Sequence, residues 1–207
     1  MIKALQLIFE PVKTWDAIAR KERSLIGVLF LSLMPAILFA CILEGWGLVQ
    51  LGNRPTHLGF TSHQLVTVSP ESALRFECGQ AVVSLLTVFL LTLFLHLLLR
   101  SFHHRSTITA SFTVMAYSYG PLLLMQAVDG IPSIPSWICR IAGAVLAAKL
   151  FYVGLVRVVR PDPTTALGLY FLGALLLFAF AGISQFVVLH ILEGSLFTHV
   201  AGLAVSR

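Results

Sequence analysis

Five long apolar stretches divide the chain. They lie at residues 25–43, 81–99, 108–128, 137–156 and 166–192. About 20 helical residues cross the hydrocarbon core of a bilayer, and none of the stretches alternates like a membrane β-strand. The pattern therefore predicts five transmembrane helices. The fifth stretch is longer than a span requires, so that helix is expected to tilt, bend or protrude.

The polar segments between most stretches are short, which favours a compact antiparallel helical bundle. The exception is residues 44–80, a long loop on one side of the membrane. Within it, "SPESALRFE" has the pattern of a helix start, with Ser69 as the N-cap and Pro70 in the first turn. We expect the whole chain, residues 1–207, to form one all-α membrane domain.

An amphipathic segment, residues 10–22, precedes the first span. Its apolar positions Val12, Trp15, Ile18 and Ala19 recur at helical spacing, with charges on the opposite face. Such a helix is expected to lie in the membrane interface. The residues predicted at that interface are Trp15, Lys13, Arg20, Lys21, Arg23, Arg100 and Arg105.

The composition excludes an ordinary soluble domain. Apolar residues make up 57% of the chain and charged residues 11%, against about 45–50% and ~25% in soluble domains. The formal charge of +5 is dispersed between apolar stretches. That distribution favours contact with anionic phospholipid and argues against a nucleic-acid partner.

The basic residues also predict the orientation. With the N-terminus inside, nine of them fall on the inner side and four on the outer side. The inner nine are Lys3, Lys13, Arg20, Lys21, Arg23, Arg100, Arg105, Arg157 and Arg160; the outer four are Arg54, Arg75, Arg140 and Arg207. The excess favours a cytoplasmic N-terminus and an outer C-terminus.

Lys149 lies inside the fourth stretch, in "AAKLFYVG". A span ending near Val159 places it about ten residues, or ~15 Å, from the inner surface. A lysine near the bilayer centre costs ~2.5–3.5 kcal/mol, and no Asp or Glu lies in any of the five stretches. An ion pair at the same depth within the chain is therefore excluded.

Three explanations of Lys149 remain open. Its ammonium group can face hydroxyls of the third stretch and the carbonyl of Tyr117, which Pro121 leaves without its usual donor. It can line a polar interhelical cavity for an anionic headgroup or a transported anion. It can also lie at a shallower depth and extend to the interface. The candidate ligand-binding residues are Lys149, Tyr117, Thr113, Thr109 and Tyr152.

A second candidate site lies at the outer ends of two spans. "ILEG" occurs at 42–45 and again at 191–194, and His190 lies three residues before Glu193. Glu44, His190 and Glu193 are the residue types of a metal or proton site. The plainer alternative is that both carboxylates mark helix ends, with Gly45 and Gly194 as C-terminal stops.

The three cysteines show no metal-binding spacing, and no cofactor is expected. All three fall toward the outer side, where a Cys78–Cys139 disulfide is one possibility and buried free thiols are the other. The chain shows no nucleophile with a base, no phosphate-binding glycine loop and no paired catalytic carboxylates, so we expect no enzymatic activity.

Three segments together resemble the Yip family of five-span membrane proteins, named for interaction with Ypt and Rab GTPases. They are "EPVKTWDAIARKE" (10–22), the third span with Tyr117, Tyr119, Gly120 and Pro121, and "YVGL" (152–155) followed by "RPDPTTAL". The resemblance implies five spans and a cytoplasmic N-terminus. Bacterial relatives are inner-membrane proteins, and eukaryotic ones act in Golgi and endoplasmic-reticulum traffic.

Only about 24 residues precede the first span, so GTPase binding is not expected to carry over from the eukaryotic relatives. The sequence predicts membrane organisation or lipid handling through a polar interhelical cavity, in a bacterial inner membrane. The alternative is a small transporter or channel for an anionic or lipid-like substrate. Small residues in "AGAVLAA" (142–148) allow a homo-oligomer or a membrane-protein partner.

Overall fold

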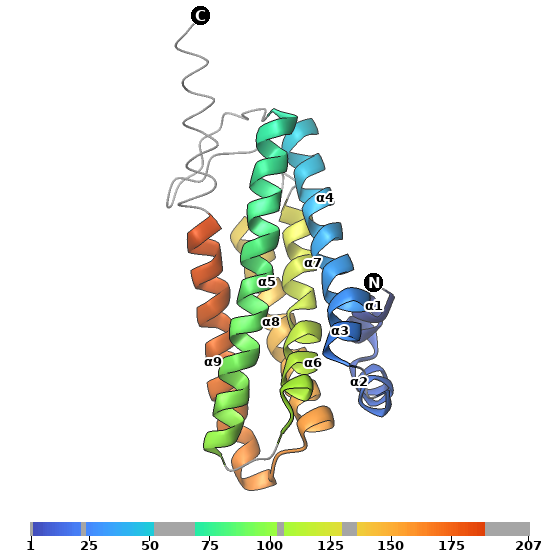
Figure 1. Ribbon diagram of the computed structural model, residues 1–207, viewed down its shortest axis with the longest axis vertical. Coiled ribbons are helices and arrows are strands. Elements are labelled where there is room, and N and C mark those ends of the chain that lie inside the picture. The colour runs from blue at the N-terminus through green and yellow to red at the C-terminus, as the bar shows by residue number, and fades with distance from the viewer. Residues whose placement is uncertain (1, 22–23, 52–68, 103–105, 130–135, 189–207) are drawn as a thin grey trace, which may run out of the picture.

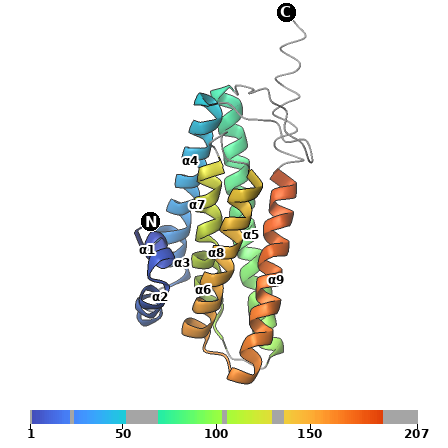
Figure 2. The same cartoon turned by 180° about the vertical axis from the view of Figure 1, so that it is seen from behind.

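The computed structural model describes residues 2–21, 24–51, 69–102, 106–129 and 136–188, and every element within these ranges is helical. Five helices are long and apolar enough to cross a membrane, as predicted. They stand side by side in one antiparallel bundle (Figures 1 and 2). Their bounds are Leu25–Gln50, Pro70–Ser101, Ile108–Asp129, Trp137–Val159 and Thr164–Val187.

The bundle has two ends, which differ in their chemistry. We call proximal the end where the second span stops at Ser101 and the fourth at Val159. We call distal the end where the first span stops at Gln50 and the second begins at Pro70. The N-terminal helices lie against the side of the bundle in its proximal half (Figure 1).

The first span is one continuous stack of three helical segments. It consists of α3 (Leu25–Val28), a π-helical segment η1 (Leu29–Leu33) and α4 (Met34–Gln50). The expected end at residue 43 is wrong, because α4 continues for two more turns. Glu44 therefore lies inside a helix, and Gly45 is not the predicted C-terminal stop.

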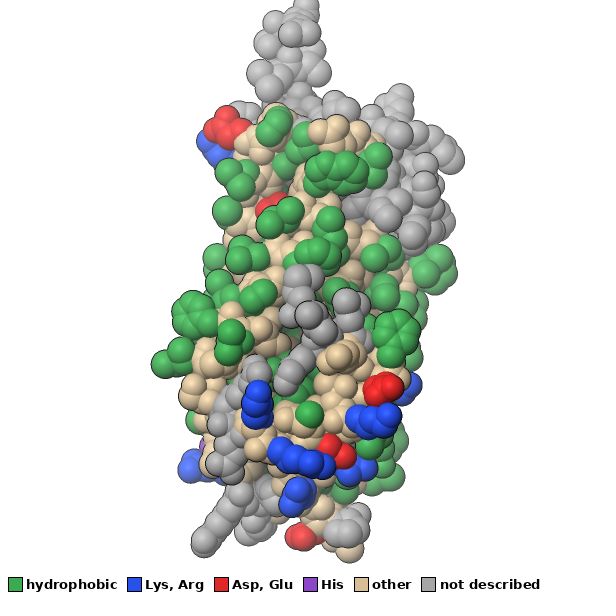
Figure 3. Space-filling view, turned by 90° about the vertical axis from the view of Figure 1, so that its right-hand side faces the viewer, with side chains coloured by type: hydrophobic (Ala, Val, Ile, Leu, Met, Phe, Trp, Pro, Cys, Tyr) green, Lys and Arg blue, Asp and Glu red, His purple; other side chains and the backbone are tan. Residues whose placement is uncertain are grey.

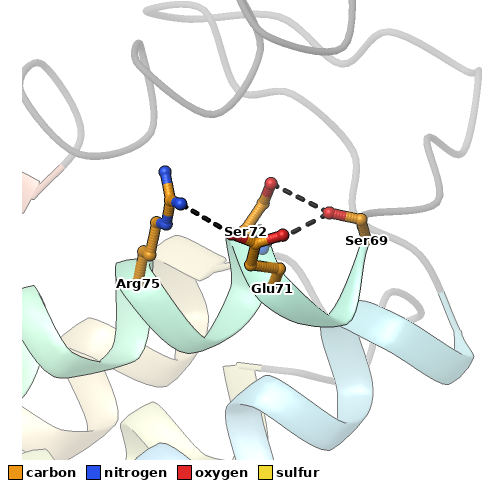
Figure 4. Close-up of polar contacts among 4 residues, drawn as sticks. All are labelled: Ser69, Glu71, Ser72 and Arg75. Atoms are coloured by element: carbon orange, nitrogen blue, oxygen red, sulfur yellow. Dashed lines mark hydrogen bonds and ion pairs between the residues drawn. The ribbon is translucent and has the colours of Figure 1, made fainter.

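The second span begins as the sequence predicted. Ser69 caps α5 (Pro70–Ser101), its hydroxyl accepting a hydrogen bond of 3.3 Å from the backbone N–H of Ser72. Figure 4 shows this first turn, where Arg75 also pairs with Glu71 on the exposed surface. With 32 residues, α5 is about 48 Å long. It therefore takes up the last part of the segment expected as loop 44–80.

The third span is the most enclosed of the five, because 67% of an 18-residue apolar stretch within it is buried. This span is also divided in two. α6 (Ile108–Ser118) and α7 (Gly120–Asp129) meet at Tyr119. The break follows from Pro121, which has no N–H to donate to the carbonyl of Tyr117. The sequence predicted the missing donor at Pro121 but one undivided span over residues 108–128.

The fourth span comprises α8 (Ser136–Gly154) and the π-helical segment η2 (Leu155–Val159). Arg160 ends it in the left-handed conformation with φ of 54°. α9 (Pro163–Val187) then packs against α5 and α8. The last residues of the fifth predicted stretch, 189–192, lie outside the described ranges.

Two short helices precede the bundle, one more than the sequence predicted. α1 (Ile2–Phe9) contacts α7 and α8, and α2 (Pro11–Arg20) contacts α8 and η2. Leu7 of α1 and Trp15 of α2 are each 0% exposed. These contacts hold both helices on the bundle itself, and α2 corresponds to the amphipathic segment 10–22.

Candidate functional site

The proximal site is formed by Trp15 of α2 in a notch on the fourth span. A Cβ atom placed on Gly154 would lie only 2.6 Å from Cζ2 of Trp15, so glycine is what lets the indole approach the α8 backbone. The indole also meets Tyr117 edge-on, with ring centroids 5.8 Å apart and planes at 75°. Asp16 and Arg157 add an ion pair of 3.2 Å between α2 and η2.

Trp15 was predicted to contact lipid headgroups, but the structure buries its side chain against the bundle. Its face of α2 is apolar because it packs on the bundle, and Ile18 (5% exposed) is buried with it. Val12, predicted on the same stripe, is 44% exposed. Lys13, Arg20, Lys21 and Arg100 are exposed, and Arg23 and Arg105 lie outside the described residues.

On the face that carries α1 and α2, Lys and Arg side chains gather toward the proximal end together with a few Asp and Glu, and hydrophobic side chains are spread over the part of this face beyond them (Figure 3). This separation is the surface pattern of a protein whose apolar part is immersed in lipid and whose basic part meets headgroups.

Lys149 lies on the outside of the bundle, which contradicts the two explanations that placed it in the interior and leaves the third, in which it extends to the interface. Its side chain is exposed and makes no hydrogen bond or ion pair within the described ranges. It belongs to the exposed face of the fourth span, together with Ile141, Val145 and Tyr152 of α8 and Val156 of η2. These positions recur every three or four residues, the period of one helical face.

The other candidate ligand residues divide between interior and surface. Tyr117 and Thr113 are buried at 3% and 8% exposure, whereas Tyr152 is 50% exposed. The Thr113 hydroxyl donates to the Thr109 carbonyl of its own helix at 2.8 Å. These residues therefore do not meet around Lys149. The Tyr117 hydroxyl is buried without a hydrogen-bond partner in the described residues.

The structure instead brings together a polar cluster in the distal half, which the sequence did not predict. At its centre, one carboxylate oxygen of Glu44 (Oε2) accepts hydrogen bonds from two amides. Gln80 of α5 donates at 2.5 Å and Gln126 of α7 at 2.9 Å. Glu44 thus joins three spans through one oxygen atom.

Glu77 lies beside this centre, one helical turn before Gln80. It is 6% exposed, and neither of its carboxylate oxygens has a hydrogen-bond partner in the described residues. A Cβ placed on Gly45 would lie 3.1 Å from Cγ of Glu77, so glycine makes room for this side chain against α4. The Cys41 thiol donates to the Glu77 backbone carbonyl at 3.7 Å.

The cluster continues to the edge of the bundle through Asp129 of α7 and Arg140 of α8, whose charged atoms are 3.8 Å apart. The carboxylates of Glu77 and Asp129 lie close enough to Glu44 to interact with it electrostatically. Three carboxylates therefore share this region with one guanidinium group. A local excess of negative charge results unless further positive charge binds there.

Only one residue of the predicted metal or proton site lies in the described part of the chain. Glu44 belongs to the cluster, but His190 and Glu193 lie outside the described residues. Among the described residues, no group of three or more His, Cys, Asp or Glu side chains is arranged to hold a metal ion. Glu77 was missed because it stands before the second apolar stretch, at the end of the segment 69–77 that was predicted only as a helix start.

The possible Cys78–Cys139 disulfide is absent from the described residues, in which all three cysteines are free. Cys41 and Cys139 are buried, as the alternative prediction expected, but Cys78 is exposed. The two candidate partners thus occupy different environments, one on the surface of α5 and one inside the bundle on α8.

The five apolar helices, the basic proximal surface and the polar cluster define an integral membrane protein of the helical-bundle type. The model of the Yip1 domain family matches residues 5–186, most of the chain. The protein therefore belongs to this family, as the three resembling segments predicted. No curated protein and no solved structure matches the chain.

Proposed function

We propose that this protein is a non-enzymatic membrane-organising protein that binds anionic phospholipid at its proximal end. The position of Lys149 carries the proposal. It precedes Gly154 by five residues, or about 7.5 Å along the helix axis, and Gly154 is where α2 docks. If α2 lies at interface depth, Lys149 extends its stem along apolar surface and places its ammonium group among lipid phosphates.

Neighbouring groups support the same ligand. Tyr152 lies one turn closer to the interface and is half exposed. Lys13, Arg20 and Lys21 are exposed on α2. Each basic residue near an anionic surface adds about 1 kcal/mol of attraction. Because Lys149 faces outward, the lipid is bound on the surface of the bundle and not in an interhelical cavity.

The proposed location is a bacterial inner membrane, with the N-terminus cytoplasmic and the C-terminus outside. The distribution of basic residues supports this orientation, since anionic lipid and positively charged loops meet on the cytoplasmic side. A single-cysteine variant at Lys21, in a background without native cysteines, should react with a membrane-impermeant maleimide only after the inner membrane is opened. Reaction with intact spheroplasts contradicts the orientation.

Lipid binding is tested with protein reconstituted in nanodiscs that contain anionic and zwitterionic phospholipid. Native mass spectrometry measures which lipid stays with the protein when the disc is removed. Lys149→Met should lose most of the anionic lipid, and Lys149→Arg should retain it. Arg75→Met removes the same charge at the distal end and serves as the matched control.

Equal retention by Lys149→Met and Arg75→Met contradicts the proposal. The rival function, transport of an anion, is tested in proteoliposomes with the same variants. We expect no protein-dependent flux of chloride or phosphate. A flux that depends on Lys149 favours the transporter and overturns the organising role.

A further inference from the structure

The distal cluster contains acceptor atoms without donors, and this suggests a second binding site. Both carboxylate oxygens of Glu77 are buried and unpaired within the described residues, and so is Oε1 of Gln80, a side chain that is 5% exposed. The amide nitrogen of Gln80 faces Glu44, which directs Oε1 away from it. Three buried oxygens therefore lack the positive charge or hydrogen that such atoms require.

Among the described residues, no positively charged group is paired with Glu77. The titratable groups beside Glu77 are Glu44 and Cys41 of α4, and the Cys41 thiol is a neutral donor near the carboxylate. Further out, Asp129 of α7 lies near Glu44, and Cys139 and Arg140 of α8 lie near Asp129. Arg140 is paired with Asp129. The described part of α9 contributes no charged residue, and Glu71, Arg75 and Cys78 lie on the exposed side of α5.

We propose that Glu77, with Glu44 and Gln80, forms a binding site for one monovalent cation, a proton or an alkali-metal ion, taken from the distal side. Oxygen ligands suit hard cations, and the arrangement of the described residues does not favour a metal that needs several His, Cys or carboxylate ligands. Intramembrane carboxylates facing a bundle interior commonly mark ion or proton pathways.

A bound proton and a bound alkali-metal ion would each supply the missing partner to the same oxygen atoms of Glu77 and Gln80. In the proton form, one oxygen of Glu77 takes a proton from hydronium, an O–H bond forms and water is released. The new hydroxyl can donate to Oε1 of Gln80, one turn away on the same helical face. In the metal form, an alkali ion contacts the Glu77 carboxylate and Oε1 of Gln80 directly.

The cluster lies near the distal boundary of the apolar region, which gives the ion a short path from water. Glu44 directly follows the apolar stretch 25–43, and Glu77 precedes the stretch 81–99. The site is independent of the proximal lipid contact, and neither residue belongs to that surface. An ion bound on α5 beside the Glu44 centre, where three spans meet, can control the packing of these spans without crossing the membrane.

The test uses the full chain in zwitterionic nanodiscs and measures the thermal unfolding midpoint. Sodium, potassium and choline chloride are compared at equal ionic strength over a range of pH. The variants are Glu77→Gln, which keeps the size of the side chain, and Glu71→Gln on the same helix. Glu71 is the matched control because it is exposed and pairs with Arg75.

An alkali ion is identified if sodium or potassium raises the unfolding midpoint above its value in choline. This rise should occur in the wild type and in Glu71→Gln but not in Glu77→Gln. A midpoint in choline that falls as pH rises, with a clearly weaker slope in Glu77→Gln alone, identifies a proton. This sign follows because the folded state then holds more protons than the unfolded state. Identical responses of wild type and Glu77→Gln, or no response to either ion, overturn the proposal.

A second measurement does not depend on the folding of any variant. An apolar carbodiimide, which modifies protonated carboxyl groups within membranes, is applied to the wild type in choline chloride, and labelled peptides are mapped by mass spectrometry. We expect Glu77 to carry at least tenfold more label than Glu71. Protection by sodium or potassium indicates the metal form, and labelling that alkali ions leave unchanged indicates the proton form. No label on Glu77 at any pH overturns the site.

Discussion

The two ends of the bundle differ in where their polar side chains lie. At the proximal end the interior is aromatic, with Trp15 against Gly154 and Tyr117, and the exposed charges lie on the surface. At the distal end the surface carries a simple exposed pair, Glu71 and Arg75, while Glu77 is enclosed. A substitution in the proximal interior therefore changes packing, whereas one in the distal interior changes charge and hydrogen bonding.

Trp15→Ala should produce the largest effect, because it empties a fully buried site that joins α2 to the fourth span. We expect a loss of about 3–5 kcal/mol in the free energy of unfolding, measured in mixed micelles. Val12→Ala on the exposed side of the same helix is the control and should change it little. Equal losses of stability for both variants would show that the packing of α2 on the bundle does not depend on Trp15 in the notch at Gly154.

Gln126→Met tests the distal end at nearly constant side-chain volume. It removes one of the two amides that hold Glu44, and hydrogen bonds to charged groups contribute about 1.5–3 kcal/mol. Gln185→Met is the matched control, since its amide makes no hydrogen bond in the described part of the chain. If chemical denaturation gives the two variants the same stability, the Glu44 centre is not structural.

Gly154→Ala tests the proximal notch from the other side. The added methyl group would overlap the Trp15 ring, and overpacking costs about 1–3 kcal/mol. Gly182→Ala, whose Cβ would meet nothing within 4 Å, should be neutral or slightly stabilising. The difference in thermal midpoint between these two glycine variants measures how much the close contact of Trp15 with Gly154 contributes to stability. A difference near zero would show that this contact does not distinguish the proximal end from the distal end.

Local signals predicted local features well. Ser69 and Pro70 mark the start of α5, and Pro121 marks the division of the third span, because each acts on the backbone around it. Five spans followed from length and hydropathy. These features need no knowledge of which helices are neighbours.

Features that depend on neighbouring helices were predicted poorly. Glu44 and Gly45 have the pattern of a helix end, yet the helix continues through them, and Gln80 and Gln126 supply hydrogen-bond donors to Glu44 from other spans. Lys149 was placed inside because an apolar span looks alike on its lipid face and its packed face. Its register with Val145 and Tyr152 was the available clue to exposure.

The notch at Gly154 also has a consequence for biosynthesis. Trp15 is synthesised before the fourth span, and its binding site exists only after that span has entered the bilayer. Until then the indole has no protein partner there, and membrane interfaces are where tryptophan is favoured. The N-terminal helix therefore rests on the lipid surface first and is captured by the bundle late in assembly.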